Sequence, residues 1–185
     1  FKFKKRSGEI RMRQIRRKLR RLNSLLDKNP ENAQVKKEIT KISEILGKIE
    51  LEHYKLCVSH YPTDLGMKYE YALRLLRTGH YDDAIPLFQE SQRDPRRKIS
   101  AMSKIGLCFY MKGWYRDAID IFEESIKLYE IKDDEISKEL RYNLARSYEQ
   151  EGEEDSALEI YRKIAQMDFG YKDVRQRVDN LRKKS

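Results

Sequence analysis

The chain has 185 residues, of which 39% are hydrophobic and 38% are charged, and it contains eight Gly and four Pro. This balance is too polar for a protein embedded in a membrane and too apolar for a disordered one. Because Gly and Pro are scarce while Leu, Ile, Lys, Arg and Glu are abundant, the predicted fold class is all-α. The sequence has no run of about 18 apolar residues and no signal peptide. It begins at Phe1 rather than Met, so we expect it to be a piece of a longer protein.

The formal net charge of +9 is concentrated at the N-terminal end. Residues 2–21 contain eleven Lys and Arg and one acidic residue, Glu9, which gives this segment a net charge of +10. The rest of the chain therefore has a net charge of −1. Such a segment attracts phosphate, which predicts RNA, DNA or an anionic membrane face as its partner. The alternatives are a solvated flank and a pairing with an acidic protein. No aromatic residue interleaves with the arginines, so base stacking is not expected. The predicted basic patch is Arg11, Arg13, Arg16, Arg17, Lys18, Arg20 and Arg21.

Apolar residues at alternating spacings of three and four predict two helices with a heptad seam. The seam positions are Met12, Ile15, Leu19, Leu22 and Leu26, then Val35, Ile39, Ile42, Leu46, Ile49, His53 and Leu56. Between them, Asn29 is the predicted helix cap, and Pro30 suits the first turn of a new helix. We therefore predict an antiparallel coiled-coil hairpin of residues 9–28 and 31–58, with Ile15 near Leu46. Its second helix should end near Tyr61, and homo-oligomerisation through the hairpin is an alternative use of it.

A ten-residue segment then occurs three times, as GHYDDAIPLF at 79–88, GWYRDAIDIF at 113–122 and GEEDSALEIY at 152–161. Each copy has a Gly, an Ala five residues later and an aromatic residue four further on. The glycine permits the left-handed conformation that ends a helix, and the small Ala fits where two helices cross closely. The aromatic residue fills the space one turn away. Each copy follows another apolar helical stretch, so each unit is a helical hairpin. These residues are Gly79, Ala84 and Phe88, Gly113, Ala118 and Phe122, and Gly152, Ala157 and Tyr161.

This pattern resembles the tetratricopeptide repeat, which has a W-x2-L-G-x2-Y helix, a Gly turn, then A-x3-F and a Pro. Three copies in phase cover residues 66–168, and the segments 60–96 and 138–174 are similar to bacterial tetratricopeptide proteins. The departures are Lys68, Met102 and Arg141 in place of the opening Trp, and Glu154 in place of an aromatic residue. Five extra residues around 129–139 predict longer helices or a wider acidic loop between the second and third units. The resemblance implies a right-handed α-solenoid.

After the third unit, Val174, Val178 and Leu181 fall on one face of a predicted helix over 171–184. The last open face of a solenoid needs a helix with a polar outer side, so this segment is a predicted capping helix. The predicted domains are a basic hairpin at 1–61, three repeats at 62–170 and the capping helix at 171–185.

The resemblance implies a groove lined by the first helix of each repeat, where a peptide or protein segment binds. Tyrosines beside Leu, Met and Arg are typical of binding hot spots. The alternative is that the leucines belong to the core of a slightly rotated helix. The predicted groove residues are Tyr69, Leu73, Arg77, Lys104, Leu107, Tyr110, Met111, Tyr142, Asn143 and Arg146. Chaperone-binding members of the family hold a C-terminal carboxylate with Lys and Asn; here Tyr69 and Leu73 stand at those places, so that activity is not expected.

No catalytic or metal-ligating constellation is apparent. His53, His60 and His80 are scattered and have no cysteine partners at the spacing of metal ligands. The phosphate-binding motifs G-x-x-x-x-G-K-S/T and G-x-G-x-x-G are both absent from the sequence. Cys57 and Cys108 lie in apolar stretches and are predicted to be buried thiols in a reducing compartment. We therefore predict a non-enzymatic scaffold or adaptor without cofactor or small-molecule substrate, in the cytoplasm or at the cytoplasmic face of a membrane. The alternative function is binding of nucleic acid or an anionic surface through residues 2–21.

Overall fold

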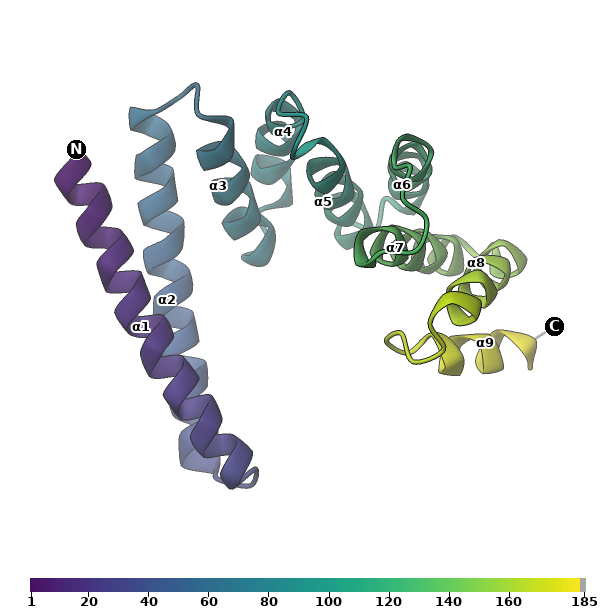
Figure 1. Ribbon diagram of the computed structural model, residues 1–185, viewed down its shortest axis with the longest axis horizontal. Helices are drawn as coiled ribbons and strands as arrows, with labels where there is room; N and C mark the ends of the chain where they lie inside the picture. The colour runs from purple at the N-terminus through teal and green to yellow at the C-terminus, as the bar shows by residue number, and fades with distance from the viewer. Residues whose placement is uncertain (184–185) are drawn as a thin grey trace. The chain divides into compact units, whose positions relative to one another are not determined.

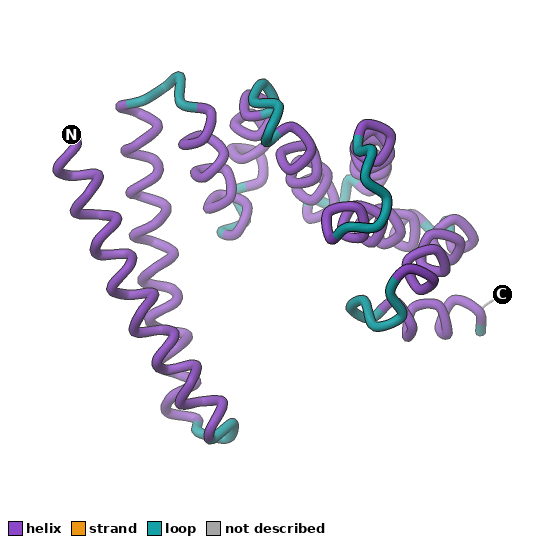
Figure 2. Tube along the Cα trace, viewed as in Figure 1, coloured by secondary structure: helices purple, strands orange, loops and turns teal. Residues whose placement is uncertain are grey.

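The computed structural model describes residues 1–183, which form helices joined by short loops and contain no strand (Figure 2). The helices are α1 (Lys2–Lys28), α2 (Ala33–His60), α3 (Leu65–Arg77), α4 (Tyr81–Ser91), α5 (Lys98–Met111), α6 (Tyr115–Leu128), α7 (Glu135–Glu151), α8 (Glu154–Met167) and α9 (Val174–Arg182) (Figure 1). The all-α prediction is confirmed. Among the described residues, no helix is both long enough and apolar enough to cross a lipid bilayer.

The chain divides into two compact units, one of residues 1–80 and one that begins at Tyr81. The first unit holds α1, α2 and α3, and the second holds α4 to α9. The boundary falls in the turn between α3 and α4, inside the first predicted repeat. The predicted domain limits at residues 61 and 170 stay a prediction, because compactness alone does not say which segments fold independently.

In the first unit, α1 and α2 run side by side in opposite directions (Figure 1). Gly8 lies against His53, since a Cβ on Gly8 would come within 2.3 Å of the His53 Nδ1 atom. In an antiparallel pair, this register places Ile15 level with Leu46 and Leu22 level with Ile39, as predicted. The second helix ends at His60, also as predicted, and Asp64 caps α3 by accepting a hydrogen bond from the Met67 amide.

Two details of the hairpin differ from the prediction. The residue that caps α2 is Asn32, whose side chain accepts a bond from the Val35 amide, whereas Asn29 and Pro30 lie in the turn. The capping residue directly precedes the helix and bonds an amide two or three residues further on, and α2 begins only at Ala33. Leu56, predicted to lie in the seam, is 43% exposed. Two helices bury only one narrow stripe between them, so the edge of a heptad pattern stays in contact with water.

The residues that define the repeat pattern pack as predicted. Ala118, Phe122, Ala157 and Tyr161 are fully buried, as are Ala84 and Phe88 of α4. The turn glycines Gly79, Gly113 and Gly152 all have φ near +80°, the left-handed region that favours glycine. The five extra residues divide between a loop at 129–134 and the 17-residue helix α7, which Asp134 caps.

The C-terminal helix closes this unit. Val174, Val178 and Leu181 of α9 are buried in one cluster with Tyr161 and Ile164 of α8. The apolar stripe predicted for the capping helix therefore faces the core, and the polar residues of α9 face outward.

Candidate interaction surfaces

Two side-chain bonds join α5 to α7, the first helices of the second and third repeats. Lys104 Nζ donates to the Glu139 carboxylate at 3.1 Å. Six residues further along α5, the Tyr110 hydroxyl accepts a hydrogen bond from the Arg146 guanidinium at 2.9 Å. The same guanidinium lies 4.4 Å from the centroid of the Tyr110 ring and 5.8 Å from that of Tyr142. We call the surface around these bonds the α5–α7 face.

Arg146 of α7 differs from Arg177 of α9 in its electrostatic partners. Tyr110 stands three residues before Gly113, and Glu149 stands three residues before Gly152, so the two occupy the same repeat position. Glu149 binds Arg177 of α9 at 2.6 Å, and Asp173 binds the same guanidinium at 3.0 Å. The positive charge of Arg177 is therefore compensated by two carboxylates.

No carboxylate binds Arg146 among the described residues. It is partly exposed, its bonding partner is a neutral phenol, and aromatic rings hold its plane in place. A guanidinium fixed by cation–π contacts and still able to donate further hydrogen bonds is suited to a carboxylate from another molecule.

Two predicted groove residues are not available on this face. Tyr142 and Asn143 are each only 7% exposed, so the prediction that their side chains line an open groove is wrong. Tyr142 donates from its hydroxyl to Asp173 at 2.6 Å and packs edge-on against Tyr161 and Tyr171. Burial, together with this bond to Asp173, raises the pKa of the Tyr142 hydroxyl. The C-terminal segment covers α7 and so removes Tyr142 from solvent.

The other predicted groove residues fall into two sets. The first set lies on the α5–α7 face: α5 carries Lys104, Leu107, Tyr110 and Met111, and α7 carries Arg146. Met111 is 52% exposed. Tyr69, Leu73 and Arg77 lie on α3, in the first unit. Their role in binding a partner stays a prediction.

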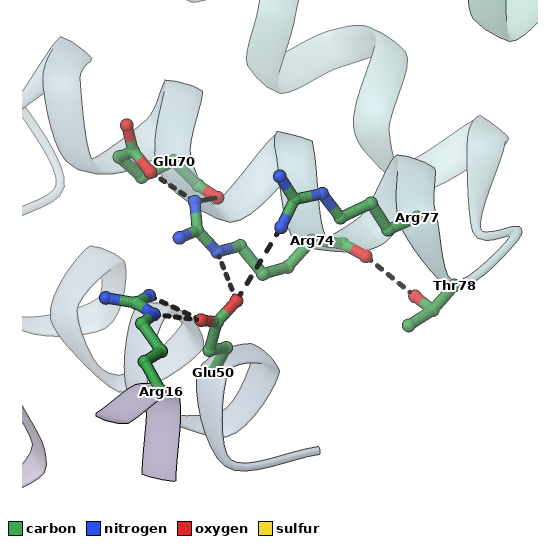
Figure 3. A network of polar contacts seen from close by, with 6 residues as sticks. All are labelled: Arg16, Glu50, Glu70, Arg74, Arg77 and Thr78. Atoms are coloured by element: carbon green, nitrogen blue, oxygen red, sulfur yellow. Dashed lines mark hydrogen bonds and ion pairs between the residues drawn. The ribbon is translucent and has the colours of Figure 1, made fainter. Parts of the chain in front are cut away.

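A buried ion network in the first unit was missed by sequence reasoning (Figure 3). Glu50 of α2 is 5% exposed, and its carboxylate accepts hydrogen bonds from Arg16 of α1 and from Arg74 Nε of α3 at 3.2 Å. Arg74 also binds Glu70 and stacks 4.2 Å from the centroid of the Tyr54 ring. The signal in the sequence was an arginine inside the apolar stretch YALRLL, because a buried guanidinium requires a carboxylate partner.

A groove of about 820 Å³ runs beside this network. Its lining is largely apolar, with cationic side chains around it, and all of its residues belong to the first unit. Among them are Arg16, Leu19, Leu46, Gly47, Lys48 and Arg77.

The predicted basic patch is mostly solvent-exposed. Arg16 and Lys18 form ion pairs with Glu50 and Glu38 of α2. The remaining five members of the patch are exposed and form no ion pair within residues 1–183; these are Arg11, Arg13, Arg17, Arg20 and Arg21. Phe3 and Ile10 of the same helix are also exposed, by 91% and 46%.

Comparisons with known structures show the same fold at low sequence identity. The crystal structure of MamA matches with a TM-score of 0.65 and 19% identity, over 79% of this chain and 82% of that one. A thermophilic tetratricopeptide protein of Thermus thermophilus matches with a TM-score of 0.60 and 20% identity, over 97% of both chains. YrrB, described as a tetratricopeptide protein with an unusual peptide-binding site, matches with a TM-score of 0.59 and 15% identity, over 88% of this chain and 82% of that one.

The comparison with curated proteins found no match. The model of the tetratricopeptide repeat matches residues 69–130 and 113–168, which together span more than half of the sequence. The match includes the second and third repeats in full, with their Gly, Ala and aromatic positions. The chain therefore belongs to the tetratricopeptide repeat family.

Proposed function

We propose that this protein is a non-enzymatic scaffold that binds a peptide or protein segment on the α5–α7 face, with Arg146 receiving a carboxylate of the partner. Tetratricopeptide proteins typically mediate protein–protein interactions, and a structural neighbour is described as having a peptide-binding site. Because the activity is binding, the proposal includes no cofactor and no small-molecule substrate.

The observation that carries this proposal is a difference between two repeats at one position: the second repeat has Tyr110 where the third has Glu149. A glutamate there neutralises Arg177, whereas Tyr110 orients Arg146 without neutralising it. A charge-assisted hydrogen bond to such a guanidinium contributes about 1.5–3 kcal/mol. Leu107 and the exposed Met111 supply apolar contact area beside it. The favoured ligand is thus a segment with an acidic residue next to an apolar anchor.

Capture of partners from extracts of the source cells, with the parent chain and a Tyr110→Glu variant, tests this proposal. The substitution copies the Glu149 arrangement, so Arg146 should acquire an internal carboxylate and lose its partner while the fold is kept. Lys127→Glu on the exposed end of α6 is the control for a simple change of net charge. Proteins held by the parent and by Lys127→Glu should be absent from the Tyr110→Glu capture. Identical sets from all three chains would contradict the proposal.

A second candidate function is binding of α1 to an anionic membrane face. It is supported by the exposure of Phe3 and Ile10, which lie seven residues apart and thus on one side of the helix. Exposed lysines flank Phe3, and exposed arginines follow Ile10 along the same helix. Cations combined with exposed apolar side chains suit a lipid surface, where both are satisfied. Duplex nucleic acid is the alternative partner of the same patch.

Vesicles with and without about one third phosphatidylserine separate these possibilities. Binding should require the anionic lipid, fall steeply with added salt and weaken with Arg13→Glu and with Phe3→Ser. Tight binding of a 20-base-pair duplex that Phe3→Ser does not affect would identify nucleic acid as the partner instead. The working location belongs to the same proposal: the cytoplasm or the cytoplasmic face of a membrane, in keeping with the free thiols Cys57 and Cys108.

A further inference from the structure

Gly47, in the middle of α2, has no packing reason within the described chain. A Cβ on the helical glycine Gly8 would meet His53 Nδ1 at 2.3 Å, and one on Gly106 would meet the Phe122 ring at 2.8 Å. At those two positions a larger residue does not fit. At Gly47 a Cβ would have no neighbour within 4 Å. Glycine destabilises a helix interior relative to alanine, and no contact of the described chain requires it at Gly47. A glycine at this position leaves room for another chain to approach the helix closely.

Gly47 lies in the wall of the groove described above, which is largely apolar. Its charged lining residues are four cations (Arg16, Lys48, Arg74 and Arg77) and two carboxylates (Glu44 and Glu50), so the balance is positive. Leu19 of α1 and Leu46 and Leu51 of α2 are only partly buried along it. The charge of Glu50 is already taken by Arg16 and Arg74. Arg77, with a side chain 68% exposed, reaches Glu50 only at 3.9 Å, and Lys48 forms no ion pair in the described part of the chain. Two cations are therefore available beside partly exposed leucines.

Within the first unit, the groove lies where the third helix stops. Helix α3 packs on α2 and ends at Arg77, where Thr78 donates from its hydroxyl to the Arg74 carbonyl oxygen. The hairpin extends further, so its half-exposed seam residues have no third helix of this unit to cover them. Another helix could pack on this uncovered part of the hairpin in the way that α3 packs on α2.

We propose that this groove binds an acidic amphipathic helix of a partner protein. A small residue of that helix would lie over Gly47, its apolar residues would cover Leu19 and Leu46, and its carboxylates would pair with Lys48 and Arg77. A second copy of this hairpin is disfavoured by charge, because residues 1–80 carry twenty Lys and Arg against nine Asp and Glu, a net +11. The site is separate from the α5–α7 face and shares no residue with it.

A displayed library of 18-residue peptides tests the proposal and does not require the partner to be identified. Alanine is fixed on one face to favour helix, and six positions on the opposite face are randomised. Peptides are selected on the parent chain after depletion on a Gly47→Phe variant, whose ring would fill the groove. The enriched sequences should carry leucine or another apolar residue with Asp or Glu beside it, and the synthesised peptides should become helical on binding.

Affinities of one enriched peptide for four variants then locate the site. Binding should fall at least tenfold with Gly47→Phe and with Arg77→Glu. It should fall by a smaller factor with Gly47→Ala, because one methyl group would hold the partner backbone further away. Lys37→Glu, an exposed change on α2 outside the groove, is the matched charge control. Circular dichroism of each variant establishes that the helices are kept. Enrichment of neutral or basic peptides, no enrichment, or equal binding by Gly47→Phe would overturn the proposal.

Discussion

Single small residues decide how closely the helices of this protein approach. At Gly106 of α5 the Phe122 ring of α6 occupies the space of a side chain, and Phe122 is fully buried, so it has no room to move. At Gly47 the same space is empty. Both glycines lie inside helices, but Gly106 is needed for packing, whereas Gly47 only lowers the stability of its helix.

Replacing each of these glycines with alanine should change stability in opposite directions. Gly106→Ala places a methyl group 2.8 Å from a buried ring and should lower the free energy of unfolding by about 1–3 kcal/mol. Gly47→Ala meets nothing and should raise it by about 0.5–1 kcal/mol through helix propensity. Urea unfolding followed by circular dichroism measures both, and changes of the same sign would be inconsistent with the packing described.

A partly buried histidine makes the hairpin sensitive to acid. Burial lowers the pKa of His53 below its ordinary value, although the nearby Glu9 opposes this. A histidine with a lowered folded-state pKa contributes stability that is present above its unfolded pKa, and this stability is lost as the pH falls through the folded value. The parent should therefore lose more thermal stability between pH 7.5 and pH 5 than His53→Gln does. His60→Gln is the control at an exposed position, and an equal loss in parent and His53→Gln would disprove the effect.

At the scale of the elements, the N-terminal hairpin follows a heptad pattern but is only partly buried. Met12 and Leu22 are buried, whereas Leu25 and Ile45 are 53% and 42% exposed. One of its buried contacts with α3 is ionic, because Arg74 reaches into α2 to meet Glu50. Removing one partner of such a buried pair leaves an uncompensated charge, so Glu50 fixes how α1, α2 and α3 meet.

The register of the hairpin predicts a specific disulfide. A cysteine pair at Ile15 and Leu46 should crosslink under mild oxidation, since the Gly8–His53 contact places these two residues level. The pair Ile15 and Ile39, one heptad out of register, should not, because disulfide geometry requires Cα atoms less than about 7 Å apart. Gel mobility with and without reductant reports both, and preferential linkage of the second pair would show a shifted register.

The sequence predicted best what depends on local pattern. The in-phase Gly, Ala and aromatic positions identified the repeats because each follows from the geometry of one helical hairpin. Tyr142 was misplaced because its exposure is decided by the C-terminal segment, which returns over α7 from some thirty residues away. Glu50 was missed for a similar reason: a heptad pattern gives no information on a third helix. The N-terminal cap of α2 was assigned to Asn29 instead of Asn32 because both are asparagines in the same turn, and the sequence does not show at which of them the helix begins.

At the scale of the whole molecule, charge divides between the two units. The first carries a net +11 and the remainder of the chain nets −2. The exposed arginines of α1 and the proposed groove at Gly47 belong to the basic unit, whereas the proposed α5–α7 face offers a partner one oriented arginine in a unit that is not basic overall. The first suits a flat anionic surface, the second a helix, and the third an extended segment held by one oriented arginine.

The proposed binding depends on the charge of Arg146, which no carboxylate of the described chain neutralises, and three titrations test this most directly. The partner segment identified by capture is titrated calorimetrically into the parent, Arg146→Gln and Tyr110→Glu, and each chain is also melted. Both substitutions should weaken binding at least tenfold, about 1.4 kcal/mol, whereas Tyr110→Glu should leave the melting temperature nearly unchanged because a new ion pair replaces the lost bond. Unchanged affinity in either variant, or a loss of affinity that only accompanies loss of folding, would contradict the account.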